Sequence, residues 1–263
     1  MSQHKEPSPP AFERRRRIDE LVSLHGTVRA SELILLFGVA DETIRRDLDR
    51  LARDGVLRRT HGGAEVIPPE TAFVRRAEQQ TPAKAAIGEQ TARLIPNDSA
   101  VILDSGTTVE HVARALGGHT DLMVITNALT NALELLDKPG ISVVLTGGLV
   151  RPATRGSVGD LAVATLKELR VDRAIIATQG WSLEGGLTYP KFEEVAVKRA
   201  MIEAASEVIL VADHTKYGHD SLVKVAPLHA VDIIITSPGL TDEQQAEIRE
   251  QGIELIIAEV DER

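Results

Sequence analysis

The chain has 263 residues, no cysteine and a formal net charge of −9. This length holds one small and one medium domain, and the lack of cysteine excludes disulfides, thiolate nucleophiles and zinc fingers. No apolar stretch approaches the roughly 18 residues of a membrane span, so we expect a cytoplasmic protein without a membrane partner. Residues 1–67 carry 12 Lys+Arg against 11 Asp+Glu, or +1, and the remainder carries 18 against 28, or −10. The acidity belongs to the second part and does not argue against nucleic-acid binding by the first.

The first residues are polar and rich in proline, so we predict a disordered tail over 1–11. A run of four arginines at 14–17 then opens a first helix. Such a run is usual on a solvated helix face, and beside a DNA-reading element it also makes non-specific contacts with phosphates. The sequence leaves both alternatives open.

The strongest helical pattern covers residues 41–53. At 3.6 residues per turn Ile44, Leu48 and Leu51 share one side, and the opposite side is rich in guanidinium groups. An earlier helical pattern ends at Gly38, which can adopt the left-handed conformation that closes a tight turn between two helices. We therefore predict a helix-turn-helix.

Residues 56–60, followed by His61-Gly62-Gly63, indicate a two-stranded wing after this helix. Arginines on the helix can reach base edges in a major groove, and those on the wing can hold the DNA backbone. The predicted DNA-contacting residues are Glu42, Thr43, Arg45, Arg46, Arg50, Arg53, Arg58, Arg59 and His61. The alternative is a small helical domain whose arginines are only a solvated face.

Four motifs of this part occur together and in order: Ser31-Glu32-Leu33, Phe37-Gly38-Val39, Thr43-Ile44-Arg45-Arg46-Asp47-Leu48 and Arg59-Thr60-His61-Gly62-Gly63-Ala64. They resemble the DNA-binding domain of the DeoR family of bacterial transcription regulators. The resemblance implies a winged helix-turn-helix over 12–67 that binds double-stranded operator DNA. Ala40 departs from the family pattern, which usually has a serine cap there, and we expect Asp41 to take over the capping. Arg29 departs likewise at the preceding helix.

The pattern changes after a proline pair at 68–69. We predict a linker over 68–82, a helix over 83–95 and an α/β domain over 83–263. Short apolar runs alternate there with helical patterns, at 101–103, 123–125, 143–145, 174–177, 208–211 and 233–235. This alternation is typical of a mainly parallel sheet with both faces covered.

Ligands of open parallel sheets bind at the carboxyl ends of the strands, so the residues after each predicted strand are candidates. Ser105-Gly106-Thr107-Thr108 precedes a helix and suits a phosphate, and Asn127 offers donors and an acceptor to a polyol. Gly147-Gly148 leaves room beside backbone amides, and Lys216 adds a positive charge. Together they favour a phosphorylated sugar or a similar anion over unrelated turns.

Further motifs, at 104–108, 126–127, 146–148, 184–188, 194–200 and 212–218, resemble the effector domain of the DeoR family. That domain is related in fold to ribose-5-phosphate isomerase and CoA-transferase-like proteins. The predicted effector-binding residues are Asp104, Ser105, Gly106, Thr107, Thr108, Asn127, Gly147, Gly148, Gln179, Glu194 and Lys216. Gln179 stands where many members have an aspartate, which leaves the effector's identity open, and we expect Trp181 at the pocket rim.

We therefore predict a transcriptional repressor of carbohydrate-metabolism genes, a nucleoid-associated homo-oligomer (dimer or tetramer) controlled by a phosphorylated sugar. No catalytic residue, cofactor or metal is predicted. The alternative is a sugar-phosphate isomerase-like enzyme, in which Asp104, Asp213, Glu194 and Lys216 supply a carboxylate base and a cationic partner. A structural adapter with an idle recognition helix is a third hypothesis. The metabolite, the operator, the sign of the response and the oligomeric state stay open.

Overall fold

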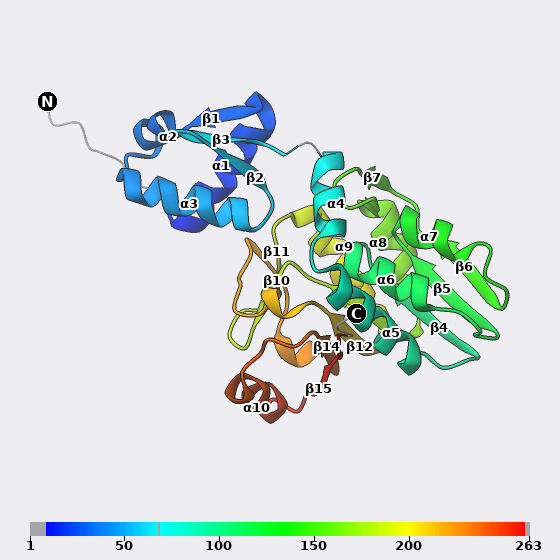
Figure 1. Cartoon of the computed structure of the whole chain (residues 1–263). Coiled ribbons are helices and arrows are strands. Elements are labelled where there is room, and N and C mark those ends of the chain that lie inside the picture. Colours follow the sequence, from blue (N-terminus) through cyan, green and yellow to red (C-terminus); the bar gives the residue numbers. More distant parts are fainter. Residues whose placement is uncertain (1–8, 68, 261–263) are drawn as a thin grey trace, which may run out of the picture. The chain divides into compact units, whose positions relative to one another are not determined.

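The structure is a computed structural model that describes residues 9–67 and 69–260 (Figure 1). The chain forms two compact units, Met1–Pro68 and Pro69–Arg263, each with its own hydrophobic core. Residues 1–8 of the predicted tail lie outside the described residues. Within the described part, no helix combines the length and the apolar character needed to cross a bilayer.

The first unit is a winged helix-turn-helix. Its helices are α1 (Ala11–His25), α2 (Ala30–Phe37) and α3 (Asp41–Arg53). Its strands are β1 (Thr27–Arg29), β2 (Leu57–Thr60) and β3 (Gly63–Val66), which form an antiparallel sheet in the order β1-β3-β2. The predicted helix-turn-helix and wing are confirmed, with a third strand before α2 that the sequence pattern did not indicate.

The turn between α2 and α3 depends on Gly38, whose φ of 64° is the left-handed conformation predicted for it. The predicted apolar side of α3 is buried, since Ile44 and Leu48 are both fully covered. They pack with Ile18 of α1 and Leu33 of α2 in a core that belongs to this unit alone. The apolar period of α3 thus fixes which of its sides points outward.

Arg14 differs from the expectation for the arginine run. Its guanidinium is buried and pairs with Asp47 of α3, with Nε and Oδ2 2.5 Å apart. A buried charge is stable only when it is paired, so Arg14 joins α1 to α3 and is withdrawn from solvent. The expected capping by Asp41 is also absent. The N-cap of α3 is Ala40, and Asp41 is its first helical residue.

The second unit is built on a parallel sheet of seven strands. In chain order these are β4 (Ser99–Leu103), β5 (Leu122–Thr126), β6 (Ile141–Leu145), β9 (Val171–Ala177), β12 (Ala205–Val211), β14 (Ile233–Thr236) and β15 (Glu254–Ile257). Their order across the sheet is β15-β14-β12-β9-β4-β5-β6, and every neighbouring pair is parallel. The predicted parallel α/β fold is confirmed.

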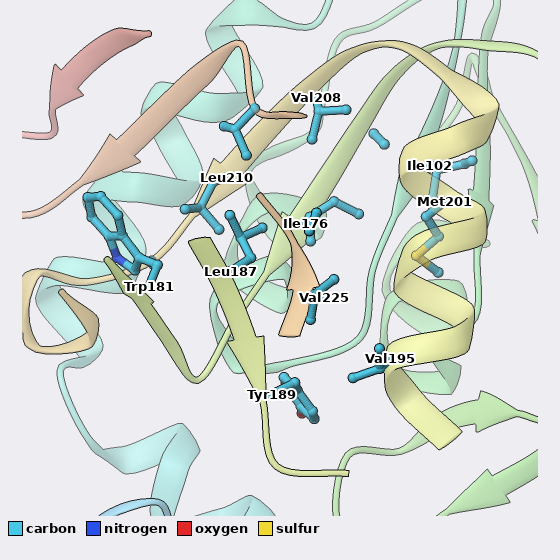
Figure 2. Packing of buried hydrophobic residues seen from close by; sticks show 14 of the residues in the cluster. Ile102, Ile176, Trp181, Leu187, Tyr189, Val195, Met201, Val208, Leu210 and Val225 are labelled. Carbon is cyan, nitrogen blue, oxygen red and sulfur yellow. The ribbon is translucent and has the colours of Figure 1, made fainter. Parts of the chain in front are cut away.

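Both faces of this sheet are covered, as its apolar strands require. Helices α5 (Thr81–Leu94), α6 (Thr107–Ala115) and α7 (Leu129–Leu135) pack on one face. The other face carries α8 (Asp160–Lys167), α9 (Phe192–Ala204) and a small sheet of β10 (Gly180–Ser182), β11 (Gly186–Tyr189) and β13 (Val223–Ala226). Figure 2 shows this second core, in which Trp181, Leu187 and Val225 of the small sheet lie beside Ile176 and Leu210.

Shorter elements complete the second unit. A two-stranded antiparallel sheet joins β7 (Leu149–Arg151) and β8 (Gly156–Val158). The 3₁₀ helices η1 (His214–Lys216) and η2 (Leu228–Ala230) follow β12 and β13, and α10 (Asp242–Glu250) precedes β15.

The segment predicted as a linker, 68–82, contains a helix. Helix α4 spans Pro69–Glu78, and α5 begins at Thr81. Between them Gln80 adopts a left-handed conformation with φ 54°. Proline is well tolerated at the first position of a helix, where its missing N–H has no partner to lose. Pro69, the second residue of the pair that indicated a break, therefore marks the start of α4.

Candidate DNA-binding surface and effector site

The outward side of α3 carries alternating charges. Arg45 pairs with Asp41 at 2.8 Å, and Arg46 with Glu42 at 3.2 Å, each across one helical turn. Exposed pairs of this kind contribute about 0.3–0.5 kcal/mol, so they are easily exchanged for a phosphate or a base edge. The Arg46 side chain is 78% exposed, which makes it the freest of these groups to reach a ligand.

The other predicted DNA-contacting arginines differ in how strongly neighbouring groups hold their side chains. Arg50 is partly covered and pairs with Asp54 at 3.5 Å, so it lies closer to the body of the unit than the helical wheel indicated. Arg59 lies against Asp49 at 2.9 Å and donates to the Gly63 carbonyl at 2.9 Å, which ties the wing to α3.

The other four predicted residues lie on α3 or the wing as expected. Arg58 is exposed and paired with Glu65 of β3. Arg53 and His61 are exposed, and Thr43 is half-buried. All nine residues therefore share one structural module, and the arginines among them are held by acidic partners or carbonyls to different degrees.

In the second unit, a cavity of about 300 Å³ opens beyond the carboxyl ends of β4, β9 and β12. These are neighbouring strands, and the chain leaves β4 toward β5 on one side and returns through β9 on the other. Such a switch point is the usual ligand site of an open parallel sheet. The cavity is lined by Arg76, Gln79, Gln80, Lys84, Ser105, Gly106, Thr107, Thr108, Thr154, Ala177, Thr178, Gln179, Tyr189, Asp213, Thr215 and Lys216.

Three cationic side chains line this cavity. Arg76 belongs to α4, Lys84 to α5 and Lys216 to η1. The Asp213 carboxylate accepts from the Thr215 backbone N–H at 3.1 Å and from the Thr215 hydroxyl, so its charge is already partly satisfied. The cavity therefore has an excess of positive charge and suits an anion.

Lys84 is the most unusual of the three cations because its side chain is buried. Its Nζ donates to the backbone carbonyls of Arg76 and Gln79, the latter at 2.6 Å. Burial lowers the pKa of Lys84 to about 8, and Asp213 opposes that effect only in part. A bound anion would favour the charged form of this amine.

The start of α6 forms another part of the cavity lining. Gly106 is its N-cap, with a φ of 132° that favours glycine, and Thr107 and Thr108 form its first turn. The first N–H groups of a helix have no partner within the helix, and its dipole attracts negative charge. This turn therefore offers donors to an anion in the cavity.

Five of the predicted effector-binding residues do not line the cavity. Asn127, Gly147 and Gly148 follow β5 and β6, which lie on the far side of β4 from β9. The Asn127 amide donates to the Ser157 carbonyl at 3.1 Å, and Gly148 adopts a φ of 124° close to the Val158 carbonyl. These residues shape the β7–β8 region.

Asp104 and Glu194 are the other two, and both are buried outside the cavity lining. Asp104 pairs with Lys198 of α9 and accepts from the Ala177 N–H at 3.0 Å, so it ties the ends of β4 and β9 together. Glu194 accepts from the Thr154 hydroxyl at 3.1 Å and lies 3.5 Å from Arg151. Burial raises the pKa of Glu194, against the opposing charges of Arg151 and Lys198.

Sequence reasoning missed several lining residues. Arg76, Gln79 and Gln80 lie in the segment taken for a linker, and Thr154 lies in the turn between β7 and β8. Tyr189 lies on β11, far along the chain from the strand ends that pointed to the site. The sequence did indicate polar side chains at 79–84, where two glutamines precede a helix that begins near a proline and carries a lysine in its first turn.

Trp181 does not lie at the cavity rim. Its side chain is fully buried and packs edge-on against Tyr217, with ring centroids 4.8 Å apart. Among the described residues, no group of three or more histidine, aspartate or glutamate side chains is arranged to hold a metal ion.

Comparisons with known proteins agree with both units. The DeoR-like helix-turn-helix domain matches residues 14–70, and the DeoR C-terminal sensor domain matches residues 79–238. An uncharacterized HTH-type transcriptional regulator of Haemophilus influenzae is 34% identical over 93% of this chain and 96% of that protein. The glycerol-3-phosphate regulon repressor of Escherichia coli is 36% identical over 85% of this chain and 90% of its own length.

The ribose 5-phosphate isomerase A structure from Neisseria gonorrhoeae is similar at a TM-score of 0.38 and 15% identity, over 57% of this chain and 54% of that one. A TM-score of 0.38 does not establish a common fold, so the expected relation to the isomerase fold stays a prediction. The two domain matches and the full-length relatives decide the family. The chain belongs to the DeoR family of transcription regulators.

Proposed function

We propose that this regulator represses carbohydrate-metabolism genes and that a phosphorylated small metabolite, bound in the cavity of the second unit, controls its operator binding. The observation that carries the proposal is the excess of positive charge around the cavity, from Arg76, Lys84 and Lys216 against Asp213. Three cations and one carboxylate leave a balance that suits the two negative charges of a phosphate monoester. The start of α6 adds backbone donors.

The similarity to the glycerol-3-phosphate regulon repressor suggests the first compound to test, glycerol 3-phosphate. Gln179 lines the cavity with an uncharged amide, which suits the hydroxyl groups of a polyol. The remaining polar lining, including Thr154 and Thr178, offers further hydroxyl contacts. The proposed ligand is therefore a small phosphorylated polyol or sugar.

DNA binding is assigned to α3 and the wing of the first unit. Arg46 is the residue proposed to read base edges, because its side chain is 78% exposed and its partner Glu42 is also exposed. Arg58 is proposed to contact phosphates. Two such units, one from each copy of the chain, would occupy two half-sites of a symmetric operator, so we propose a homo-oligomer acting at the nucleoid.

We propose no enzymatic activity. Of the carboxylates available to an isomerase, Asp104 is engaged by Lys198 and Glu194 lies outside the cavity lining. Asp213 lines the cavity but is already an acceptor for Thr215. A general base must reach the proton that it removes, and neither Asp104 nor Glu194 lines the cavity, which leaves Asp213 as the candidate base of the isomerase alternative. Incubation with ribose 5-phosphate should yield no ketose, and turnover would favour the isomerase alternative.

The proposal is tested by isothermal titration calorimetry of the full chain with glycerol 3-phosphate, glycerol and inorganic phosphate. We expect glycerol 3-phosphate to bind and glycerol not to bind. Lys216→Met should weaken binding at least about tenfold through the lost charge contact. Lys167→Met, at an exposed position of α8, is the matched control and should bind as the wild type does.

The link to DNA is measured on genomic fragments selected by the wild-type protein. Adding the bound compound should change the affinity for these fragments, because a ligand that controls binding must have different affinities for the two forms of the protein. The proposal is wrong if no phosphorylated compound of a sugar and polyol panel binds, or if the bound compound leaves DNA affinity unchanged.

A further inference from the structure

The edge of the large sheet carries an exposed apolar surface whose residues do not line the cavity. Strand β6 is the last strand of the sheet, and among the described residues it pairs only with β5. We define the β6 surface by Leu133, Val144, Leu145, Leu149, Val150 and Leu161, whose exposed fractions range from 38% to 75%. Clustered exposed aliphatic side chains of this kind usually mark an interaction site.

The residues of the β6 surface come from elements that adjoin one another. Helix α7, which carries Leu133, packs on β6, and β7 follows β6 after a short turn. Leu161 of α8 lies beside that turn, because its Cβ is 3.7 Å from where a Cβ on Gly147 would be. Figure 1 shows α7 and β6 as neighbours in the green part of the second unit.

This edge lacks the features by which isolated edge strands usually avoid pairing. Residues 141–150 contain no charged residue and no proline. The nearest lysine, Lys138, is engaged elsewhere, since its Nζ donates to the carbonyls of Ala113 and Leu116 at the end of α6. No charged side chain within 141–150 therefore hinders another strand from pairing with the outer edge of β6.

We propose that the β6 surface binds the β6 surface of a second copy of this chain around a two-fold axis, with the two β6 strands antiparallel. An interface of this type uses the same patch on both copies and closes at two subunits. Antiparallel self-pairing of β6 brings no like charges together, because the strand is uncharged. The inference rests on the proposed function for its choice of partner, since two operator half-sites require two copies.

The test is the molar mass of the full chain at micromolar concentration, from light scattering after size exclusion, without DNA or ligand. We expect the wild type at twice the protomer mass of 28.5 kDa or a multiple of it. Leu149→Lys should weaken assembly at least about tenfold, because it places a charge in an apolar interface. The matched control is Leu24→Lys in α1, where the leucine is 77% exposed against 75% for Leu149.

Hydrogen exchange distinguishes strand pairing from other contacts. The backbone amides of β6 that point away from β5 should be protected in the wild type and exchange faster in Leu149→Lys, while the amides of β4 stay protected in both. A monomeric wild type, an unchanged assembly of Leu149→Lys, or an equal loss in Leu24→Lys would overturn the proposal. Glycerol 3-phosphate binding, measured on the same samples, tests the proposed function separately, because the cavity residues are not part of the β6 surface.

Discussion

Lys84 makes ligand binding depend on pH in a way that can be measured directly. Its amine is buried, lines the cavity and donates to the carbonyls of Arg76 and Gln79. Because burial lowers its pKa to about 8, about half of the free protein carries a neutral Lys84 at pH 8. A dianionic ligand beside the amine favours the charged form, so its binding draws a proton from solution.

The sign of the effect on folding follows from the same pKa. The unfolded chain holds the proton of this lysine up to pH 10.5, and the folded chain releases it from about 8. Stability therefore rises with pH between about 8 and 10.5, and the burial penalty is fully present below 8. A shift of this size corresponds to at most about 3 kcal/mol, and to less here because the group faces an open cavity.

Lys84→Met removes this penalty but leaves the Arg76 and Gln79 carbonyls without their donor, which costs about 1–3 kcal/mol. The two effects oppose each other, so we expect the variant to fold with nearly unchanged stability. Its ligand affinity should fall, because the contact between amine and anion is lost. Urea unfolding of the variant checks the first expectation.

The assay is calorimetry of glycerol 3-phosphate binding at pH 8 in buffers of different ionisation enthalpy. Phosphate monoesters are already dianions at this pH, since their second pKa is about 6. The wild type should take up about half a proton per ligand, and Lys84→Met should take up none. Lys216→Arg, which keeps the second cavity charge, should behave as the wild type. The absence of uptake in the wild type, or equal uptake in Lys84→Met, would refute the role assigned to Lys84.

Arg46→Ala should reduce discrimination between selected and random DNA by about 1–3 kcal/mol, whereas Arg58→Ala should weaken binding to the two kinds of DNA equally. Fluorescence anisotropy measures these affinities, and equal effects of the two variants would contradict the assignment. Asp104→Asn leaves Lys198 buried without its carboxylate and should cost about 3–5 kcal/mol in urea unfolding, and a loss below about 1 kcal/mol would contradict the pairing. Gly63→Ala places a Cβ 2.0 Å from a backbone carbonyl of β1. It should lower the melting transition of the first unit alone, and calorimetry showing no such change would refute the close approach.

The first unit could be predicted from sequence because its determinants are local. The apolar period of Ile44, Leu48 and Leu51 places the arginines of α3 outward, and Gly38 marks the turn before it. Arg14 escaped because its partner, Asp47, lies on another helix, and nothing in a run of four arginines says which one turns inward. The apolar periodicity of a helix predicts which of its sides is exposed, but it does not predict an ion pair with another helix.

The cavity was only partly accessible to the same reasoning. The predicted strand ends identified Ser105, Thr107 and Lys216, which line the cavity. The sequence pattern does not determine the order of the strands across the sheet. Strand β4 has β9 as a neighbour, about seventy residues later, and the predicted site residues that follow β5 and β6 do not line the cavity. Asn127 follows β5, which is why the sequence pattern predicted it as an effector-binding residue.

Helix α4 links the cavity lining to the start of the second unit. Its first residue, Pro69, follows directly on the residue that ends the first unit, and Arg76 near its other end lines the cavity. These two residues are about 10 Å apart along the helix axis at 1.5 Å per residue. The covalent path from the cavity lining to the first unit therefore runs through one short helix.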